Sequence, residues 1–411
     1  MPDLTVTAIG RHGDGVVMLE GRRLYAPGAL PGDTVRGEMR QDGSLIGPTL
    51  ISRGALHAAP PCRHFSNCGG CTTQHIALEA YTAWKHQIVI DALRDNNLVC
   101  GQVDAPLISP PRSRRRATFA VKKPGKQAVI GFNRASSPEV IDLGECHVLR
   151  PELTALLPPL RAIMPDYLSE VRELDIRLTW LDGALDMVII GGSEPKLRQR
   201  EILASLAQDQ NIARISWRKF DRSADETILQ RVPLRAHFAH GVVDFPPGAF
   251  LQATAEGEAI LSSAVAAATA SAAPVADLFC GLGTFALSLT PRAMTAVDGD
   301  GVAIAALQRA VAGRQRTQVI ARNLVREPMS SEELKVFQAV IFDPPRDGAK
   351  HQARQLAVSC VPLVVAVSCD LNSFCRDAKL LQEGGYKLMR TLLVDQFLWS
   401  AHLELVGVFR K

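Results

Sequence analysis

The chain has 411 residues, of which 47% are hydrophobic and 21% are charged, and its formal net charge is +4. This composition is typical of a soluble globular protein, and the length suggests two or three domains. The charge is too small to indicate a nucleic-acid partner by itself, so such a partner must be argued from local clusters of basic residues.

The apolar segments and the cysteines indicate the cellular compartment. Apolar runs such as residues 264–268 are far shorter than the roughly 20 residues of a membrane span. Residues 1–10 lack the basic start and apolar block of a secretion signal. We therefore expect a cytoplasmic protein with no membrane partner, whose nine cysteines are thiols or metal ligands rather than disulfides.

Short alternating segments fill residues 1–56, and glycine and proline residues such as Gly13, Gly15 and Pro27 separate them. This pattern predicts short strands joined by turns, and hence a small β-barrel. Small barrels often bind nucleic acid on a strand face, but a spacer or a partner-binding module has the same pattern.

Three cysteines are closely spaced in the segment CRHFSNCGGC, and a fourth follows in LGECHVL. The four are Cys62, Cys68, Cys71 and Cys146. The close spacing, with two glycines that let the loop wrap, indicates a metal site. Four thiolates suit a structural zinc ion or an iron-sulfur cluster, and the spacing does not separate the two.

Helices and strands are mixed in residues 57–247, which we expect to form an α+β domain. Residues 79–98 have a helical pattern, and strands are predicted at 116–123, 128–134, 176–181, 185–192 and 213–220. The densest basic run overlaps the first of these strands and consists of Arg112, Arg114, Arg115, Arg116, Lys122 and Lys123. With Phe119 and Val121 facing inward, the strand could present a basic stripe to RNA phosphates, although such runs are also common on solvated surfaces.

From residue 248 on, apolar runs alternate with helical stretches, which predicts a parallel sheet covered on both faces. The first run ends near Phe279 and is followed by Gly281, Gly283 and a segment with a helical pattern. The polar residues Asp298, Asn323 and Asp343 follow the next three runs. Since open α/β sheets bind ligands at the carboxyl ends of their strands, this edge is the predicted ligand site.

The glycine turn indicates the class of ligand. The segment CGLGTF lacks the third glycine of a dinucleotide site, and the chain has no G-x-x-x-x-G-K-[ST] phosphate loop. What remains resembles the S-adenosylmethionine pocket of Rossmann-like methyltransferases, with Asp298 placed to accept the ribose hydroxyls. After the motif DPP this chain has Arg346, where amino-methylating enzymes typically have an aromatic residue.

Cys369 follows a fifth apolar run and is expected at the same edge, beside Asp343. A thiolate there can add to C6 of uracil, which makes C5 nucleophilic enough to accept a methyl group, and a base must then remove the C5 proton. Glu404 starts the last apolar strand, with His402 two positions earlier, and is the candidate base. The alternatives are a packing role for Cys369 and a surface salt bridge for Glu404.

Four segments together, SCD, DPPRDGA, HLELV and FLQAT, resemble the RNA 5-methyluridine methyltransferases, specifically the iron-sulfur branch that acts on 23S ribosomal RNA. The resemblance covers nearly the whole chain. It implies an α/β fold: a TRAM-type RNA-binding barrel at 1–56, a central domain with an iron-sulfur site at 57–247, and a Rossmann-like methyltransferase domain at 248–411.

The same resemblance assigns roles to single residues. Cys369 would be the nucleophile and Glu404 the proton acceptor. The residues expected to contact S-adenosylmethionine are Gln252, Phe279, Thr284, Asp298, Asn323 and Asp343. The cysteines Cys62, Cys68, Cys71 and Cys146 would hold a [4Fe-4S] cluster, with zinc as the alternative.

The chain departs from the family pattern at four positions. Asp370 replaces the usual Asn of the S-C-N motif, and Thr284 stands where Asn is frequent. Leu398 and Ser400 replace a usual Pro and a usual Thr. These departures affect the positioning of the target base and the cofactor rather than the thiol and the carboxylate.

The favoured substrate is 23S ribosomal RNA, with transfer RNA as the alternative, and we expect the protein to act as a monomer. Two other classes of function remain open. A methyltransferase for another base or for protein would leave the paired thiol and carboxylate unexplained. A non-catalytic iron-sulfur RNA-binding protein would leave the complete ligand edge unexplained.

Overall fold

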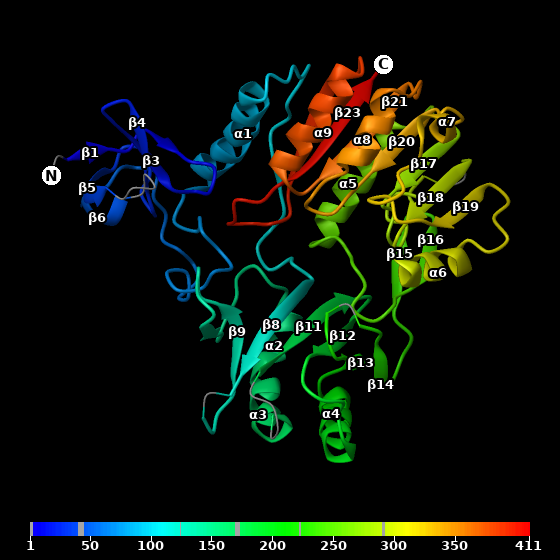
Figure 1. The fold of residues 1–411 in the computed structure, drawn as a ribbon. Helices are drawn as coiled ribbons and strands as arrows, with labels where there is room; N and C mark the ends of the chain where they lie inside the picture. The colour runs from blue at the N-terminus through cyan, green and yellow to red at the C-terminus, as the bar shows by residue number, and fades with distance from the viewer. Residues whose placement is uncertain (1–2, 40–44, 124, 169–172, 222, 290–291) are drawn as a thin grey trace.

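The computed structural model describes residues 3–39, 45–123, 125–168, 173–221, 223–289 and 292–411. Three groups of strands dominate the fold (Figure 1). The N-terminal strands lie to one side, the central sheet lies below, and the C-terminal sheet lies above with most of the helices. None of the helices in the described residues is both long and apolar enough to cross a bilayer.

The N-terminal strands form two antiparallel sheets of three strands, ordered β1-β5-β6 and β2-β3-β4. Their bounds are β1 Leu4–Thr5, β2 Ala8–Ile9, β3 Gly15–Leu19, β4 Arg22–Ala26, β5 Thr34–Met39 and β6 Leu45–Ser52. The two sheets share a small apolar core that includes Leu4, Val17, Leu24 and Val35. This confirms the short strands that the sequence predicts, while their closure into a barrel stays a prediction.

The central sheet has seven strands in the order β10-β9-β8-β11-β12-β13-β14. The strands are β8 Arg116–Lys122, β9 Val129–Asn133, β10 Val140–Asp142, β11 Glu173–Leu181, β12 Ala184–Ile190, β13 Ile212–Arg218 and β14 Glu226–Gln230. Phe119 and Val121 point into one core with residues of α2 Pro151–Ala155, α3 Leu157–Tyr167 and α4 Leu197–Asp209. The five strands predicted in this region are therefore confirmed.

The C-terminal sheet has eight strands in the order β19-β18-β17-β20-β21-β23-β22-β7. The five parallel strands are β17 Val275–Leu278, β18 Met294–Asp298, β19 Thr317–Ala321, β20 Ala339–Phe342 and β21 Leu363–Ser368. The strand β23 Glu404–Arg410 runs antiparallel between β21 and β22 Lys387–Asp395. Apolar side chains on both faces form two separate cores, as expected for a sheet covered on both sides.

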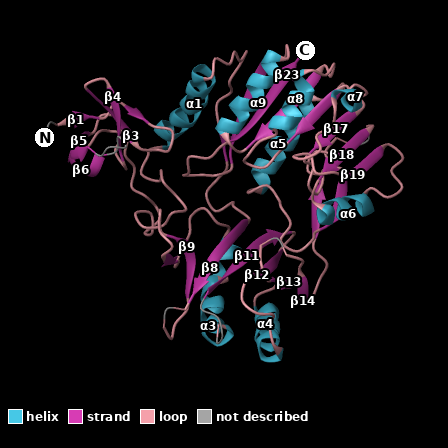
Figure 2. Ribbon diagram, in the orientation of Figure 1, coloured by secondary structure: helices cyan, strands magenta, loops and turns pink. Residues whose placement is uncertain are grey.

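The helices of this part are α5 Ala255–Ala268, α6 Gly301–Ala310, α7 Ser331–Leu334, α8 Lys350–Ala357 and α9 Leu371–Glu383. Figure 2 shows them around the C-terminal sheet. The hairpin of β15 Arg235–Phe238 and β16 Gly241–Asp244 also belongs here, because Ala236 and Val243 lie in the same core as Val275.

The C-terminal sheet takes two more elements from a distant part of the sequence. The helix α1 Leu78–Asp95 packs beside α9, with Tyr81 and Trp84 in the same core as Phe374. The strand β7 Leu107–Ile108 pairs with β22. The sequence placed both segments in the central domain, whereas their packing joins them to the C-terminal sheet, because the buried face of α1 is matched by the apolar face of α9.

One predicted element is wrong. Residues 281–288 form consecutive turns rather than the helix that their pattern predicts. The buried carboxylate of Asp277 accepts a hydrogen bond from the Ala286 N–H at 2.8 Å. A carboxylate that binds a backbone donor inside the segment competes with regular helical hydrogen bonding, and only scattered bonds such as Leu287 N–H to Gly283 O (2.8 Å) remain.

Candidate active site

The polar residues predicted at strand ends lie along one edge of the C-terminal sheet. Phe279 follows β17, Asp298 ends β18, Asn323 comes two residues after β19, and Asp343 follows β20. Cys369 directly follows β21. These five strands are parallel neighbours (Figure 1), so their carboxyl ends share one edge. The strand bounds place all five residues at that edge.

The glycine turn after β17 is fixed by Asp298. One oxygen of its carboxylate accepts the Gly281 N–H at 2.9 Å, and the other accepts the Asp300 N–H at 2.7 Å. Phe279 has a φ of +62°, which is uncommon for a non-glycine residue and marks a tight turn at this point. Thr284 is half-buried in the same turn. Asp298 therefore has a structural role that does not depend on a bound ligand.

Asn323 also stabilises its own loop. Its side-chain oxygen accepts the backbone N–H groups of Val325 and Arg326 at 3.1 and 3.2 Å. The loop thereby stays close to Asp298 at the end of the neighbouring strand, since Asn323 lies beside Gly299. Among the residues that the structure describes, the side-chain nitrogen of Asn323 has no hydrogen-bond partner and is available to a ligand.

A chain of side-chain hydrogen bonds joins the cofactor edge to Glu404. The Gln252 side chain donates to Asp343 Oδ2 at 3.2 Å. The Gln396 side chain donates to Gln252 Oε1 at 2.7 Å and to Glu404 Oε1 at 3.0 Å. Gln252, Gln396 and Glu404 are all buried, so these bonds fix the side chains in place.

The register of the sheet places Cys369 next to Glu404. Ser368 and Leu405 are the last paired residues of β21 and β23, so Cys369 and Glu404 are the next two residues across this antiparallel pair. Glu404 is only 4% exposed, and its Oε2 atom has no hydrogen-bond partner among the described residues. A buried carboxylate oxygen without a partner is costly, and it marks a position that a ligand can satisfy.

The acidic groups at this edge have shifted pKa values. Burial and the nearby Asp343 carboxylate together raise the pKa of Glu404 to about 8, against the hydrogen bond from Gln396, which lowers it. Burial raises the pKa of Asp343 to about 7. Burial, together with the charges of Glu404 and Asp343, raises the pKa of the Cys369 thiol to about 12, while Arg346 lowers it. Three such groups around one point favour a cationic ligand, which would stabilise their charged forms.

The departure at Asp370 has a simple local explanation. Asp370 is the N-cap of α9, and its side chain accepts the Ser373 N–H at 2.8 Å. Asn and Asp are both strong N-cap residues because each offers a short side-chain oxygen to the first turn. The cap therefore forms with either residue, and the helix that follows Cys369 starts at the same point.

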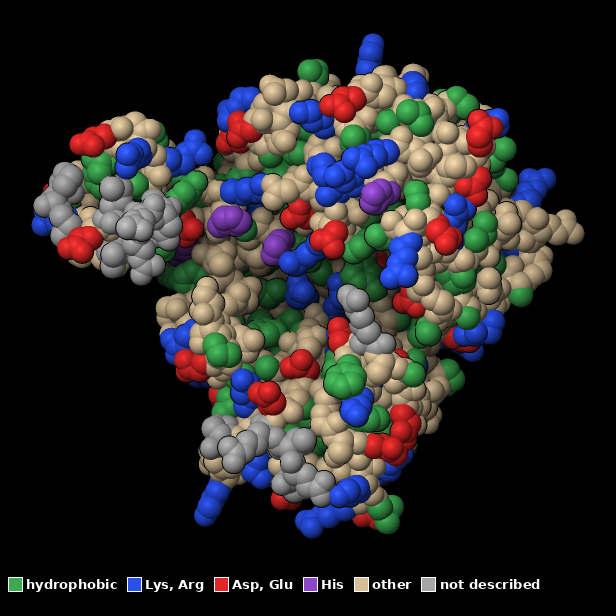
Figure 3. Space-filling model, in the orientation of Figure 1, with side chains coloured by type: hydrophobic (Ala, Val, Ile, Leu, Met, Phe, Trp, Pro, Cys, Tyr) green, Lys and Arg blue, Asp and Glu red, His purple; other side chains and the backbone are tan. Residues whose placement is uncertain are grey.

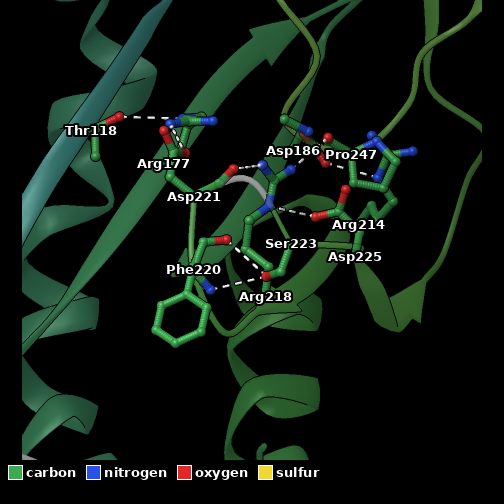
Figure 4. Close-up of polar contacts among 11 residues, drawn as sticks. Thr118, Arg177, Asp186, Arg214, Arg218, Phe220, Asp221, Ser223, Asp225 and Pro247 are labelled. Carbon is green, nitrogen blue, oxygen red and sulfur yellow. Dashed lines mark hydrogen bonds and ion pairs between the residues drawn. The ribbon is translucent and has the colours of Figure 1, made fainter. Parts of the chain in front are cut away.

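The segment that leads into Gln252 is held by the central sheet. Arg214 and Asp186 form a buried ion pair (2.8 Å), Asp186 also accepts the Gly248 N–H (2.9 Å), and Arg214 donates to Phe245 O. Arg218 donates to Pro247 O at 3.1 Å (Figure 4). These bonds to the backbone of residues 245–248 fix the start of the loop from which Gln252 reaches Asp343.

The four predicted metal ligands lie around a common cavity of about 580 Å³. Cys62, Cys68, Cys71 and Cys146 line it together with residues of the loop 396–403. Burial, together with the other three cysteines, raises the pKa of Cys71 to about 12, so the thiols are within electrostatic range of one another. Among the described residues, however, no three or more His, Cys, Asp or Glu side chains come together as a metal-binding group.

The comparisons with known proteins agree on one family. No protein-family model matches the chain. An uncharacterized RNA methyltransferase of Brucella suis is 39% identical over 99% of this chain and 97% of its own length, and one of Caulobacter vibrioides is 37% identical over the full length of both. RlmD of Halomonas elongata, a 23S rRNA (uracil(1939)-C(5))-methyltransferase, is 29% identical over 98% of this chain and 88% of its own length. The chain belongs to the same RNA methyltransferase family as the Brucella suis and Caulobacter vibrioides proteins.

A solved structure supports the same fold. The tRNA (uracil-54, C5)-methyltransferase of Pyrococcus abyssi, in complex with S-adenosyl-L-homocysteine, aligns with a TM-score of 0.76 at 21% identity. The alignment covers 99% of this methyltransferase and all of the archaeal chain. The α/β methyltransferase fold that the sequence predicts is thus confirmed.

The basic run at residues 112–123 has Phe119 and Val121 buried on the inward face as predicted, while its role in RNA binding stays a prediction. Arg115 pairs with Glu258 at 2.6 Å, and burial lowers the pKa of Arg116 to about 10. Lys122 and Lys123 donate to the carbonyls of Pro138 and Pro165. Three residues of the run therefore have internal partners, and in Figure 3 basic and acidic side chains are interspersed over the visible face.

Some residues of the site were not singled out from the sequence. Gln396 follows Asp395 at the end of an apolar run, which is the same signal that identified Asp343. The sequence does not show the order of the strands, so it did not place Gln396 next to Glu404. Lys85 lies four residues after Tyr81 on the buried face of α1 and is itself fully buried. The sequence signal was a lysine on the apolar face of a helix, which predicts a buried acidic or carbonyl partner for that lysine.

Proposed function

We propose that this methyltransferase transfers a methyl group from S-adenosylmethionine to C5 of uracil in RNA. One observation carries the proposal: Cys369 lies beside Glu404. Both are at the sheet edge where Asp298, Asn323 and Asp343 also lie. Methylation of a base nitrogen needs no thiol, because the nitrogen lone pair attacks directly. Methylation at C5 of a pyrimidine such as uracil needs a thiol that adds to C6 and a base that removes the C5 proton.

The chain supplies the groups for each covalent step. The Cys369 thiolate adds to C6 of the uracil ring, and the electron pair of the C5–C6 double bond becomes available at C5. C5 then forms a bond to the methyl carbon, while the sulfonium sulfur keeps the electron pair of the bond that breaks. Glu404 takes the C5 proton, the C5–C6 double bond forms again, and the C6–sulfur bond breaks to release the Cys369 thiolate.

The cofactor residues follow from the same edge. We assign contacts with S-adenosylmethionine to Gln252, Phe279, Thr284, Asp298, Asn323 and Asp343. The raised pKa values of Asp343, Glu404 and Cys369 support a cationic ligand here. When bound, the cofactor supplies a methyl group on a positively charged sulfur. That charge would favour the ionised forms of Cys369 and Glu404 that the chemistry needs.

We infer that the substrate is 23S ribosomal RNA, because RlmD of Halomonas elongata aligns with nearly the whole chain. Transfer RNA is the second candidate, since the Pyrococcus abyssi enzyme has the same fold. Mapping 5-methyluridine in ribosomal and transfer RNA, with and without the gene, tests the choice. Loss of one 23S site is expected; loss of a transfer-RNA site alone would favour the alternative.

We further propose that the four cysteines hold a structural [4Fe-4S] cluster, with zinc as the alternative. Their common cavity and mutual electrostatic influence support this assignment. Anaerobically purified protein should contain iron and absorb broadly near ~400 nm. Zinc without iron would favour the alternative. We also assign residues 1–56 to an RNA-binding barrel and the protein to the cytoplasm. We expect a monomer, and the molar mass in solution tests that expectation.

Trapping with 5-fluorouridine tests the catalytic proposal directly. Fluorine cannot leave C5 as a proton does, so a methylated RNA should stay bonded to Cys369 and survive denaturing electrophoresis. Cys369→Ala should form no adduct, while Cys360→Ala, which removes an exposed thiol, should form it normally. A non-catalytic RNA-binding protein would form none in any variant.

A further inference from the structure

The loop 396–403 carries the base of the proposed reaction, because it joins Asp395 at the end of β22 to Glu404 at the start of β23. At its centre Trp399 has a φ of +61°, a conformation that costs energy for a side chain of this size. A strained residue persists only where its surroundings hold it. The contacts of Trp399 are therefore informative.

Both peptide groups of Trp399 are held from outside the loop. Its N–H donates to the Tyr81 hydroxyl oxygen at 3.0 Å. Its carbonyl accepts the N–H groups of Thr72 and Thr73 at 2.9 and 3.2 Å. Tyr81 comes from α1, and the two threonines directly follow Cys71, so two separate segments hold one residue of the loop.

The ends of the loop are held by the same helix. Lys85 is fully buried, lies 3.4 Å from the Asp395 carboxylate, and donates a hydrogen bond to the His402 carbonyl. Tyr81 also donates to Asp395. The Lys85 ammonium group therefore holds the chain at Asp395, just before Gln396, and at His402, two residues before Glu404. The side chains of Gln396 and Glu404 are themselves joined by a hydrogen bond.

We propose that Tyr81 and Lys85 are positioning residues, which hold the loop 396–403 so that Glu404 reaches the C5 proton of the substrate. This inference rests on the function proposed above and adds its second step: the two residues affect proton removal and not the attack by Cys369. Thr72 and Thr73 extend the same support to the segment that follows Cys71, so the cysteine region is mechanically joined to the base.

Tyr81→Phe removes one hydroxyl group and tests the proposal with little change in packing. Tyr386→Phe is a matched control, because Tyr386 is also buried in the same core and its hydroxyl donates to Val361 O at 2.7 Å, at the opposite end of β21. Two rates are compared: methylation of uridine RNA, which needs proton removal, and trapping on 5-fluorouridine RNA, which does not.

For Tyr81→Phe we expect kcat on uridine RNA to fall by about ten- to a hundredfold with nearly unchanged KM, while the trapping rate stays at the wild-type value. Tyr386→Phe should change neither. Equal losses of turnover and trapping, or equal behaviour of the two variants, would overturn the inference. Absence of trapping by the wild type would instead refute the proposed function.

Amide hydrogen exchange gives a readout that is independent of catalysis. Exchange in residues 397–403 should be faster in Tyr81→Phe and in Lys85→Met than in wild type or Tyr386→Phe. Unchanged exchange in both variants would show that this helix does not hold the loop.

Discussion

Gln252 and Glu404 bind the same side-chain nitrogen, that of Gln396, at 2.7 and 3.0 Å. Gln252 also reaches Asp343, so the two ends of the site share one hydrogen-bonded chain. A change in the amide of Gln396 should therefore be felt at the base and at the cofactor edge together.

Gln396→Leu should shift the pH dependence of methylation. The hydrogen bond from Gln396 lowers the pKa of Glu404, which burial has raised to about 8. Without that bond the pKa rises further, and because the base must be ionised, the rise of activity with pH should move to higher pH. Initial rates between pH 6 and 10 measure the shift. Gln308→Leu, which loses a bond to Val319 O away from the site, should leave the profile unchanged.

Glu404→Gln should trap the reaction on ordinary uridine. Glutamine keeps the oxygen that accepts from Gln396 but cannot take the C5 proton. Turnover should fall by about 10²- to 10⁴-fold, the usual contribution of a general base, while a methylated covalent adduct accumulates. Denaturing electrophoresis of labelled RNA detects the adduct. Release of methylated RNA at the wild-type rate would show that another group removes the proton.

The same substitution should stabilise the fold at alkaline pH. The pKa of Glu404 is about 8 in the folded protein against an ordinary value of 4.5. The stability that this group contributes is thus present below pH 4.5 and is lost as the pH rises through about 8. Because Gln stays neutral, the Tm difference between Glu404→Gln and wild type should be more positive at pH 9 than at pH 5.

Glu333→Gln provides a control of opposite sign. The guanidinium of Arg322 and the hydrogen bonds of Ser330 hold the pKa of Glu333 at about 2. Its contribution is present above pH 4.5 and lost on acidification, so this variant should be less stable than wild type at pH 7 and approach it below pH 3. Identical pH trends for the two variants would contradict the shifted pKa of Glu404.

Arg346→Gln should make Cys369 less reactive. The positive charge of Arg346 lowers the pKa of a thiol that burial and two carboxylates raise to about 12. Removal of the charge leaves less thiolate at any pH, so alkylation of Cys369 by iodoacetamide should slow. Peptide mass spectrometry distinguishes Cys369 from the other cysteines, and Arg354→Gln on α8 is the control.

Asp370→Ala should cost about 1 kcal/mol of stability, because α9 loses its N-cap. Asp370→Asn restores the family residue, keeps the cap, and should change the urea midpoint little. A similar loss in both variants would show that the charge, rather than the cap, stabilises this turn.

The sequence was most informative about polar residues that directly follow apolar runs, because such residues lie at the ends of buried strands. Apolar runs that end in Asp298, Asp343 and Cys369 predicted the ligand edge, because parallel strands align their carboxyl ends. Glu404 was harder to place, since only the antiparallel insertion of β23 next to β21 brings it beside Cys369.

Other features depend on contacts between distant segments. The position of α1 on the C-terminal sheet follows from a match between two buried faces, and neither face identifies its partner in the sequence. The contacts of the basic run at 112–116 depend on distant segments in the same way. Burial of Arg116 and the pairing of Arg115 with Glu258 come from the way the central strand docks against residues 250–258.

The addition of α1 and β7 to the C-terminal sheet limits how this protein can be divided or rebuilt. A fragment that starts at residue 248 would leave the outer side of β22 and the apolar side of α9 uncovered, and it would aggregate or require residues 78–108 in trans. Chimeras that exchange the RNA-targeting parts of such enzymes therefore have to transfer this internal stretch along with the catalytic half.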